Sequence, residues 1–104
     1  MNIELTKDAQ RAAAKIYKSY LEKISNGSGK ASAREFSCSE IDSVLSDESP
    51  DDVELIKEEL INTFSMKTNI LDDLTLSSSF ISYMENRFKN GIKEVLNFLS
   101  QFIP

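Results

Sequence analysis

Basic side chains in the first third of the chain have the types and spacing to contact phosphates. Four of them recur at intervals of four, four and three residues, so they share one face of a helix, and two more follow. Such a face is typical of a surface that binds a nucleic-acid backbone, and equally of an ordinary solvated helix. The residues that would contact nucleic acid are Lys7, Arg11, Lys15, Lys18, Lys30 and Arg34.

Catalytic and metal-binding chemistry has little support in the composition. The chain has no histidine and one cysteine, which excludes histidine-based acid–base catalysis, zinc sites built from several Cys and His residues, and a disulfide within one chain. Cys38 has no histidine to activate it, so we expect a small apolar residue in the interior. The acidic residues of 47–52 lack the spacing of a calcium-binding loop. We therefore expect no enzyme, no cofactor, no metal and no small-molecule substrate.

The charges are distributed unevenly along the sequence. Residues 1–36 carry seven basic and four acidic side chains, a net of +3, whereas residues 37–75 carry two basic and eleven acidic side chains, a net of −9. Residues 76–104 have a net of +1, which completes the overall −5. The asymmetry suggests an interaction surface, although solvated helix faces also produce such runs.

The acidic middle contains a clear helix start. Ser49 is a cap residue, Pro50 suits the first helical position, and the carboxylates that follow favour the positive end of the helix dipole. Residues 50–60 carry five carboxylates and one lysine, which repel DNA phosphates but suit a basic protein partner. The predicted acidic interaction surface is Asp51, Asp52, Glu54 and Glu58.

The remaining elements follow from caps and hydrophobic periodicity. Thr6 can cap a first helix over about 6–25, which Asn26-Gly27 ends, and serines can cap short helices over 30–34 and 40–45. After the third helix the period changes to that of strands. The candidate strands of a small hairpin are residues 63–66, 69–71 and 74–76.

The C-terminal segment predicts one long helix over about 78–101, capped by Ser77. Its apolar strip is broader than one small domain can cover, so we expect it to pair with the same helix of a second subunit. Packing entirely within the chain is the alternative. The predicted dimer interface is Ile81, Met84, Phe88, Val95, Phe98 and Phe102.

The order of these elements is that of a winged helix-turn-helix domain with an added C-terminal helix. We expect residues 1–104 to form one such domain, mainly α with a small β-hairpin. A helical bundle with an irregular loop at 62–76 is the structural alternative.

Three stretches carry a family resemblance: residues 16–22 (Ile-Tyr-Lys-Ser-Tyr-Leu-Glu), residues 28–36 and residues 83–91. They resemble small, largely uncharacterised winged-helix-like proteins of Gram-positive bacteria and their mobile elements. Such proteins tend to have a glycine followed by an aromatic residue after the third helix, and a glycine near the start of the final helix. This chain departs from both patterns, at 60–64 and at 77–79. The resemblance implies a winged-helix fold, and no catalytic residue.

These observations favour a non-enzymatic regulatory or protein-interaction module, which forms a homodimer through its C-terminal helix and binds a basic protein partner. The alternative is a transcription regulator that contacts DNA through the basic first third. No segment is apolar enough to cross a membrane, and the first residues lack the apolar core of a secretory signal. We therefore expect a cytoplasmic protein, in which a lone thiol stays reduced.

Overall fold

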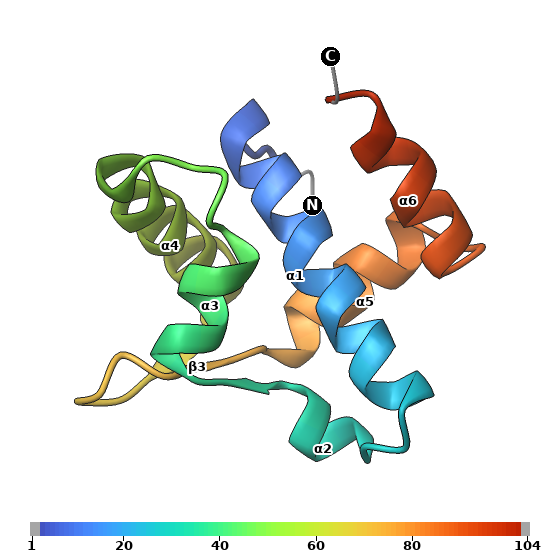
Figure 1. Ribbon diagram of the computed structural model, residues 1–104, viewed down its shortest axis with the longest axis horizontal. Helices are drawn as coiled ribbons and strands as arrows, with labels where there is room; N and C mark the ends of the chain where they lie inside the picture. Colours follow the sequence, from blue (N-terminus) through green and yellow to red (C-terminus); the bar gives the residue numbers. More distant parts are fainter. Residues whose placement is uncertain (1–2, 103–104) are drawn as a thin grey trace.

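The computed structural model describes residues 3–102 and shows a mainly helical chain with one small antiparallel sheet (Figure 1). This confirms the predicted class, mainly α with a small β-hairpin. In chain order, the elements are α1 (Lys7–Ser25), α2 (Lys30–Ala33), β1 (Glu35–Phe36), α3 (Cys38–Val44), α4 (Pro50–Phe64), β2 (Lys67–Thr68), β3 (Leu74–Thr75), α5 (Ser78–Arg87) and α6 (Ile92–Ser100).

Helix α1 is the central element and contacts each of the other helices (Figure 1). It starts as predicted, because the Thr6 hydroxyl accepts a hydrogen bond from the Ala9 amide at 3.2 Å. It ends at Asn26, and Gly27 turns the chain with a φ of +102°, which only glycine adopts easily. The alanines of α1 are buried, so the neighbouring helices can approach its backbone closely.

The starts of α3 and α4 are also fixed by local hydrogen bonds. The Ser37 hydroxyl accepts from the Glu40 amide, and the Glu40 carboxylate accepts from the Ser37 amide, which is a complete capping box. The Ser49 hydroxyl accepts from the Asp52 amide, and Pro50 occupies the first turn, as predicted. Ser77 caps α5 in the same way.

The sheet has the strand order β1-β3-β2, with both pairs antiparallel. Leu74 pairs with Phe36 on one side and with Thr68 on the other. The predicted strand over 63–66 is wrong, because α4 continues to Phe64, whose ring is buried in the core. The second candidate, 69–71, belongs to the turn between β2 and β3, whereas the third, 74–76, contains β3.

The single helix predicted over 78–101 is wrong, because the chain forms two helices, α5 and α6. Phe88 leaves the helical conformation, and Gly91 has a φ of +71°. The break turns Phe88 inward, where its ring stacks on Tyr17 with 6.3 Å between ring centroids. It also folds α6 back onto α1, so that Val95 becomes fully buried.

One hydrophobic core joins the six helices with β1 and β3. It includes Phe36 of β1, Leu60 of α4, Leu76 beyond β3 and Phe80 of α5, packed against the buried face of α1. Within residues 3–102, no helix combines the length and the apolar character needed to span a membrane.

Candidate functional site

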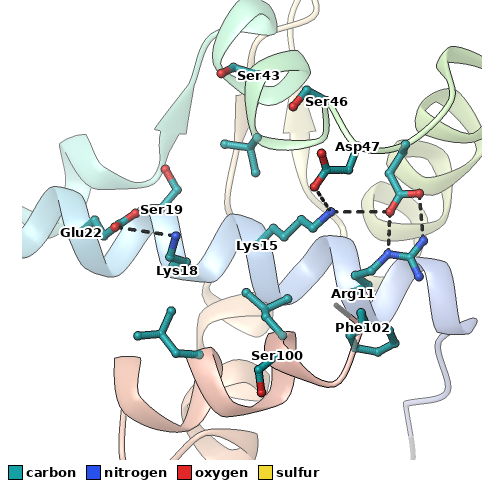
Figure 2. Close-up of a pocket in the computed structure, with 14 residues that line it drawn as sticks. Arg11, Lys15, Lys18, Ser19, Glu22, Ser43, Ser46, Asp47, Ser100 and Phe102 are labelled. Atoms are coloured by element: carbon teal, nitrogen blue, oxygen red, sulfur yellow. Dashed lines mark hydrogen bonds and ion pairs between the residues drawn. The ribbon is translucent and has the colours of Figure 1, made fainter. Parts of the chain in front are cut away.

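A groove of about 750 Å³ runs along α1, between residues 43–48 on one side and α6 on the other (Figure 2). We call it the α1 groove. Its floor is polar and basic, whereas the α6 wall is largely apolar. Its lining residues are Arg11, Lys15, Lys18, Ser19, Glu22, Ser43, Val44, Ser46, Asp47, Glu48, Leu96, Leu99, Ser100 and Phe102.

Arg11, on the floor of the groove, is held by a carboxylate from the loop before α4. Its Nε donates to Glu48 Oε1 at 2.7 Å and a terminal guanidinium nitrogen donates to Glu48 Oε2 at 2.8 Å (Figure 2). The same guanidinium also donates to Asp8 at 3.0 Å. The Glu48 side chain is only 7% exposed, so solvent screens this bidentate pair weakly.

The ion pair shifts both titrations towards the charged forms. The hydrogen bond from Arg11 lowers the pKa of the Glu48 carboxyl, and the same bond raises the pKa of the Arg11 guanidinium. In a second pair, Lys23 Nζ lies 2.9 Å from Glu40 Oε2, and the hydrogen bond from Lys23 lowers the pKa of the Glu40 carboxyl.

Other basic residues of the first helix also have acidic neighbours. Lys15 Nζ lies 3.5 Å from Asp47 Oδ2, and Lys18 Nζ lies 4.0 Å from Glu22 Oε2 (Figure 2). The basic first third therefore neutralises part of the acidic middle within the chain. Sequence reasoning missed these pairs, although the opposite net charges of the two segments were a signal that could have indicated them.

The predicted nucleic-acid residues do not form one free basic surface. Arg11, Lys15 and Lys18 share a face of α1 but lie beside carboxylates. Lys7 is exposed at the start of α1, whereas Lys30 is exposed at the start of α2. Arg34 is half-buried and donates to the Ser78 hydroxyl at 3.0 Å, so it joins α5 to the end of α2.

The four predicted acidic residues, Asp51, Asp52, Glu54 and Glu58, are all exposed on α4. Leu55 lies among them with 66% of its surface exposed. By contrast, the Glu59 carboxylate is already hydrogen-bonded within the chain, because it accepts from the amide and the hydroxyl of Thr6, both at 2.8 Å. The result is a mostly acidic helix face with an apolar side chain inside it.

The structure corrects the predicted dimer interface. Four of its residues lie in the core of the same chain: Ile81, Met84, Phe88 and Val95 are each at most 5% exposed. They are therefore unavailable to a second subunit: Ile81 and Met84 face the core from α5, and the bend at 88–91 turns Phe88 and Val95 inward. Phe98 is half-buried, and Phe102 is 39% exposed. The apolar surface that α6 leaves exposed is Ile92 and Leu96, with Phe102 beyond the helix.

The turn between β2 and β3 presents an apolar tip that sequence reasoning did not identify. Ile70 is 98% exposed and Leu71 is 71% exposed. The Asn69 side chain orders this turn, because its Oδ1 accepts from the amides of Leu71 at 2.9 Å and Asp73 at 3.1 Å. Asp72 has a φ of +61°, which completes the turn. We call residues 69–72 the hairpin tip.

The free thiol of Cys38 is half-buried. Burial raises the pKa of the thiol, and the negative charge of Asp42 raises it further. The thiol is therefore protonated near neutral pH, which makes it a weak nucleophile.

Comparison of the chain with protein-family models, with curated proteins and with solved structures gives no match.

Proposed function

We propose that this chain is a non-enzymatic protein-interaction module of winged-helix type, in which the exposed face of α4 binds a basic partner. The observation that carries the proposal is the composition of that face, where four exposed carboxylates surround the exposed side chain of Leu55. Carboxylates attract a basic surface, and an apolar residue inside them adds buried contact area, an arrangement that resembles the apolar centre and polar rim of a protein interface. A cytoplasmic location belongs to the same proposal.

The winged-helix assignment is supported by topology. Helices α3 and α4 follow each other across the short turn at 45–49, and the hairpin of β2 and β3 comes directly after α4. Strand β1 lies between α2 and α3 in the sequence and pairs with β3. In the proposed winged helix, α4 corresponds to the recognition helix of a helix-turn-helix.

The charge of α4 argues against DNA as its partner. A recognition helix gains affinity when its basic side chains release counterions from phosphates. Four of the eight exposed positions of α4 are carboxylates and none is basic, while the half-buried Lys57 lies 3.9 Å from one of these carboxylates, Glu54. Bringing this helix close to a phosphate backbone would add repulsion rather than release counterions.

In the alternative, DNA contact through the basic first third, phosphates would have to compete with carboxylates of the same chain. Arg11 and Lys15 would have to exchange Glu48 and Asp47 for phosphates, and the first of these pairs is bidentate and weakly screened. Lys7 and Lys30 remain exposed, but they begin two different helices, α1 and α2.

Self-association through α6 is the second part of the proposal. Ile92 and Leu96 are one turn apart on α6, with 38% and 46% of their surfaces exposed, and Phe102 extends the apolar area. This surface replaces the interface that the sequence predicted, and a second copy of the chain is the partner we propose for it.

The α4 surface is tested with two fluorescent probes, a mixed-sequence DNA duplex and an amphipathic peptide rich in Lys and Leu. We expect the peptide to bind, with an affinity that falls as salt rises, and the duplex not to bind at about 150 mM salt. Glu54→Lys with Glu58→Lys should weaken peptide binding strongly. The matched control, Glu35→Lys with Glu85→Lys, makes the same charge change at exposed positions of β1 and α5 and should have a much smaller effect.

Tight duplex binding at about 150 mM salt that is lost in a Lys7→Ala, Lys15→Ala, Lys18→Ala variant would contradict the proposal and favour the DNA alternative. Equal weakening of peptide binding by both charge-reversal variants would show that net charge, rather than the α4 face, drives the association.

A further inference from the structure

The hairpin tip is an apolar knob that is ordered before it meets any partner. Ile70 and Leu71 point into solvent while the Asn69 side chain holds the backbone of the turn. The base of the turn is anchored as well, because Asp73 Oδ1 accepts a hydrogen bond from the Cys38 amide at 3.1 Å. A preordered knob loses little conformational freedom on binding, which favours insertion into a complementary groove.

The tip does not use a groove of its own chain. Ile70 is almost completely exposed in the folded chain, and the tip projects from the molecule at the left of Figure 1. The apolar area that would cover it must therefore come from another molecule.

The α1 groove of a second copy has the matching composition. Its α6 wall presents Leu96, Leu99 and Phe102, while Val44 adds apolar surface on the opposite side. Its volume of about 750 Å³ lies within the range of grooves that hold small ligands, so it can take two aliphatic side chains and their turn. Leu96 and Phe102 are the same residues whose exposure supports self-association through α6.

The charges beside the two apolar parts can also pair. Asp72 is exposed next to Leu71 at the tip. In the groove, Lys18 has a loose ion pair, 4.0 Å from Glu22, compared with 2.7 Å between Arg11 and Glu48. Figure 2 shows Asp47 paired with Lys15 and Lys18 paired with Glu22, so a carboxylate approaching Lys18 would compete with the loose contact to Glu22.

We propose that the hairpin tip of one copy inserts into the α1 groove of a second copy, with Ile70 and Leu71 against the α6 wall and Asp72 beside Lys18. The inference rests on the proposed self-association and specifies its contact. Such a contact joins two different surfaces, unlike a symmetric pairing of α6 with α6. Each partner therefore needs only one of the two surfaces to form a single contact.

This asymmetry gives a complementation test by sedimentation velocity. The tip variant is Ile70→Ser with Leu71→Ser, and the groove variant is Leu96→Ser with Phe102→Ser. We expect the unmodified chain to associate at on the order of 100 µM, and each variant alone to be monomeric. An equimolar mixture of the two variants should form a 1:1 dimer, because one tip and one groove remain. Leu55→Ser removes an exposed aliphatic residue elsewhere and should associate like the unmodified chain.

A charge exchange tests the ion pair separately. In the mixed dimer, the tip variant supplies the groove and the groove variant supplies the tip. Adding Lys18→Glu to the tip variant should weaken the mixed dimer at least about tenfold. Adding Asp72→Lys to the groove variant should then restore much of that loss. Circular dichroism and urea unfolding of every variant check that the exposed substitutions leave the fold intact.

The outcomes separate this contact from the broader proposal. If the groove variant is monomeric but the tip variant still associates, self-association through α6 holds and tip insertion is overturned. If the mixture of variants stays monomeric while the unmodified chain associates, tip insertion is overturned as well. A monomeric unmodified chain overturns the inference and the self-association together, and leaves peptide binding by α4 to its own test.

Discussion

The ion pair between Arg11 and Glu48 joins two oppositely charged parts of the chain. The side chains come from α1 and from the loop before α4, 37 positions apart, and they form two short hydrogen bonds. Because Glu48 is nearly buried, removing one partner leaves a charge that water can solvate only poorly. The pair therefore contributes to the stability of the fold, and it holds the Arg11 side chain in place.

The ion pair between Arg11 and Glu48 predicts a pH-dependent effect of Glu48→Gln on stability. The folded chain lowers the pKa of Glu48 below its ordinary value of 4.5, so the stabilisation is fully present above that pH and is lost as the pH falls through the lowered value. We expect Glu48→Gln to reduce the free energy of unfolding by about 1–3 kcal/mol at pH 7, and by much less at about pH 3. Urea unfolding at both pH values measures the difference.

Glu58→Gln serves as the control, because Glu58 is exposed on α4. It should change stability by less than about 0.5 kcal/mol at either pH. A Glu48→Gln effect of equal size at both pH values would contradict an origin in the charge of this carboxylate.

At the scale of elements, the starts of α1, α4 and α5 and the position of β3 were predictable, whereas β1, β2 and the C-terminal break were not. Thr6, Ser49 and Ser77 cap their helices through contacts three residues away, so the signal is local in the sequence. The strands have two residues each, too few for a periodic pattern, and they exist because β3 pairs on both sides. The break before α6 depends on where Phe88 packs, which is a tertiary effect.

The candidate site was likewise predictable from the sequence only in part. The exposure of Asp51, Asp52, Glu54 and Glu58 follows from the amphipathic pattern of α4, so it could be predicted from the sequence. The α1 groove could not, because it requires α6 to fold back against α1. The hairpin tip could not be predicted either, because locating it requires knowing where β2 ends and where β3 begins.

The conformation of Gly91 gives the prediction at this scale. Its φ of +71° and ψ of −139° are strained for any residue with a side chain, although no atom lies within 4 Å of an added Cβ. We expect Gly91→Ala to reduce the free energy of unfolding by about 1–3 kcal/mol through backbone strain alone. Gly29→Ala is the control, because Gly29 has equally open space and an ordinary φ of −69°; Gly29 is the N-cap of the short helix α2, so this change should cost less than about 1 kcal/mol. Equal effects in urea unfolding would contradict the strain argument.

Over the whole molecule, the apolar C-terminal strip is divided between the core and the surface. Phe98 packs against Phe88 at 5.5 Å and Phe102 at 5.2 Å between ring centroids, and the Arg87 guanidinium lies 4.8 Å from the centre of its ring. Phe102 lies at the end of this aromatic row and remains partly exposed.

Phe98→Glu and Phe102→Glu should therefore differ in their effect on folding. Phe98→Glu places a carboxylate in a half-buried aromatic cluster and should cost about 3 kcal/mol or more. Phe102→Glu should cost less than about 1 kcal/mol, because solvent reaches that position. Thermal unfolding followed by circular dichroism compares the two, and a larger loss for Phe102→Glu would contradict this packing.

The bend at 88–91 also affects how the native chain fluctuates. Helix α6 follows the bend at the C-terminal end of the described chain, and Val95 is its one fully buried residue there, so it can open as a unit while α1 to α5 stay folded. Its amide protons should exchange with deuterium through an opening of lower free energy than that of the amides around Ile16. Each opening would briefly expose Tyr17 and Phe88 to water, so a small fraction of folded molecules would always lack one wall of the α1 groove.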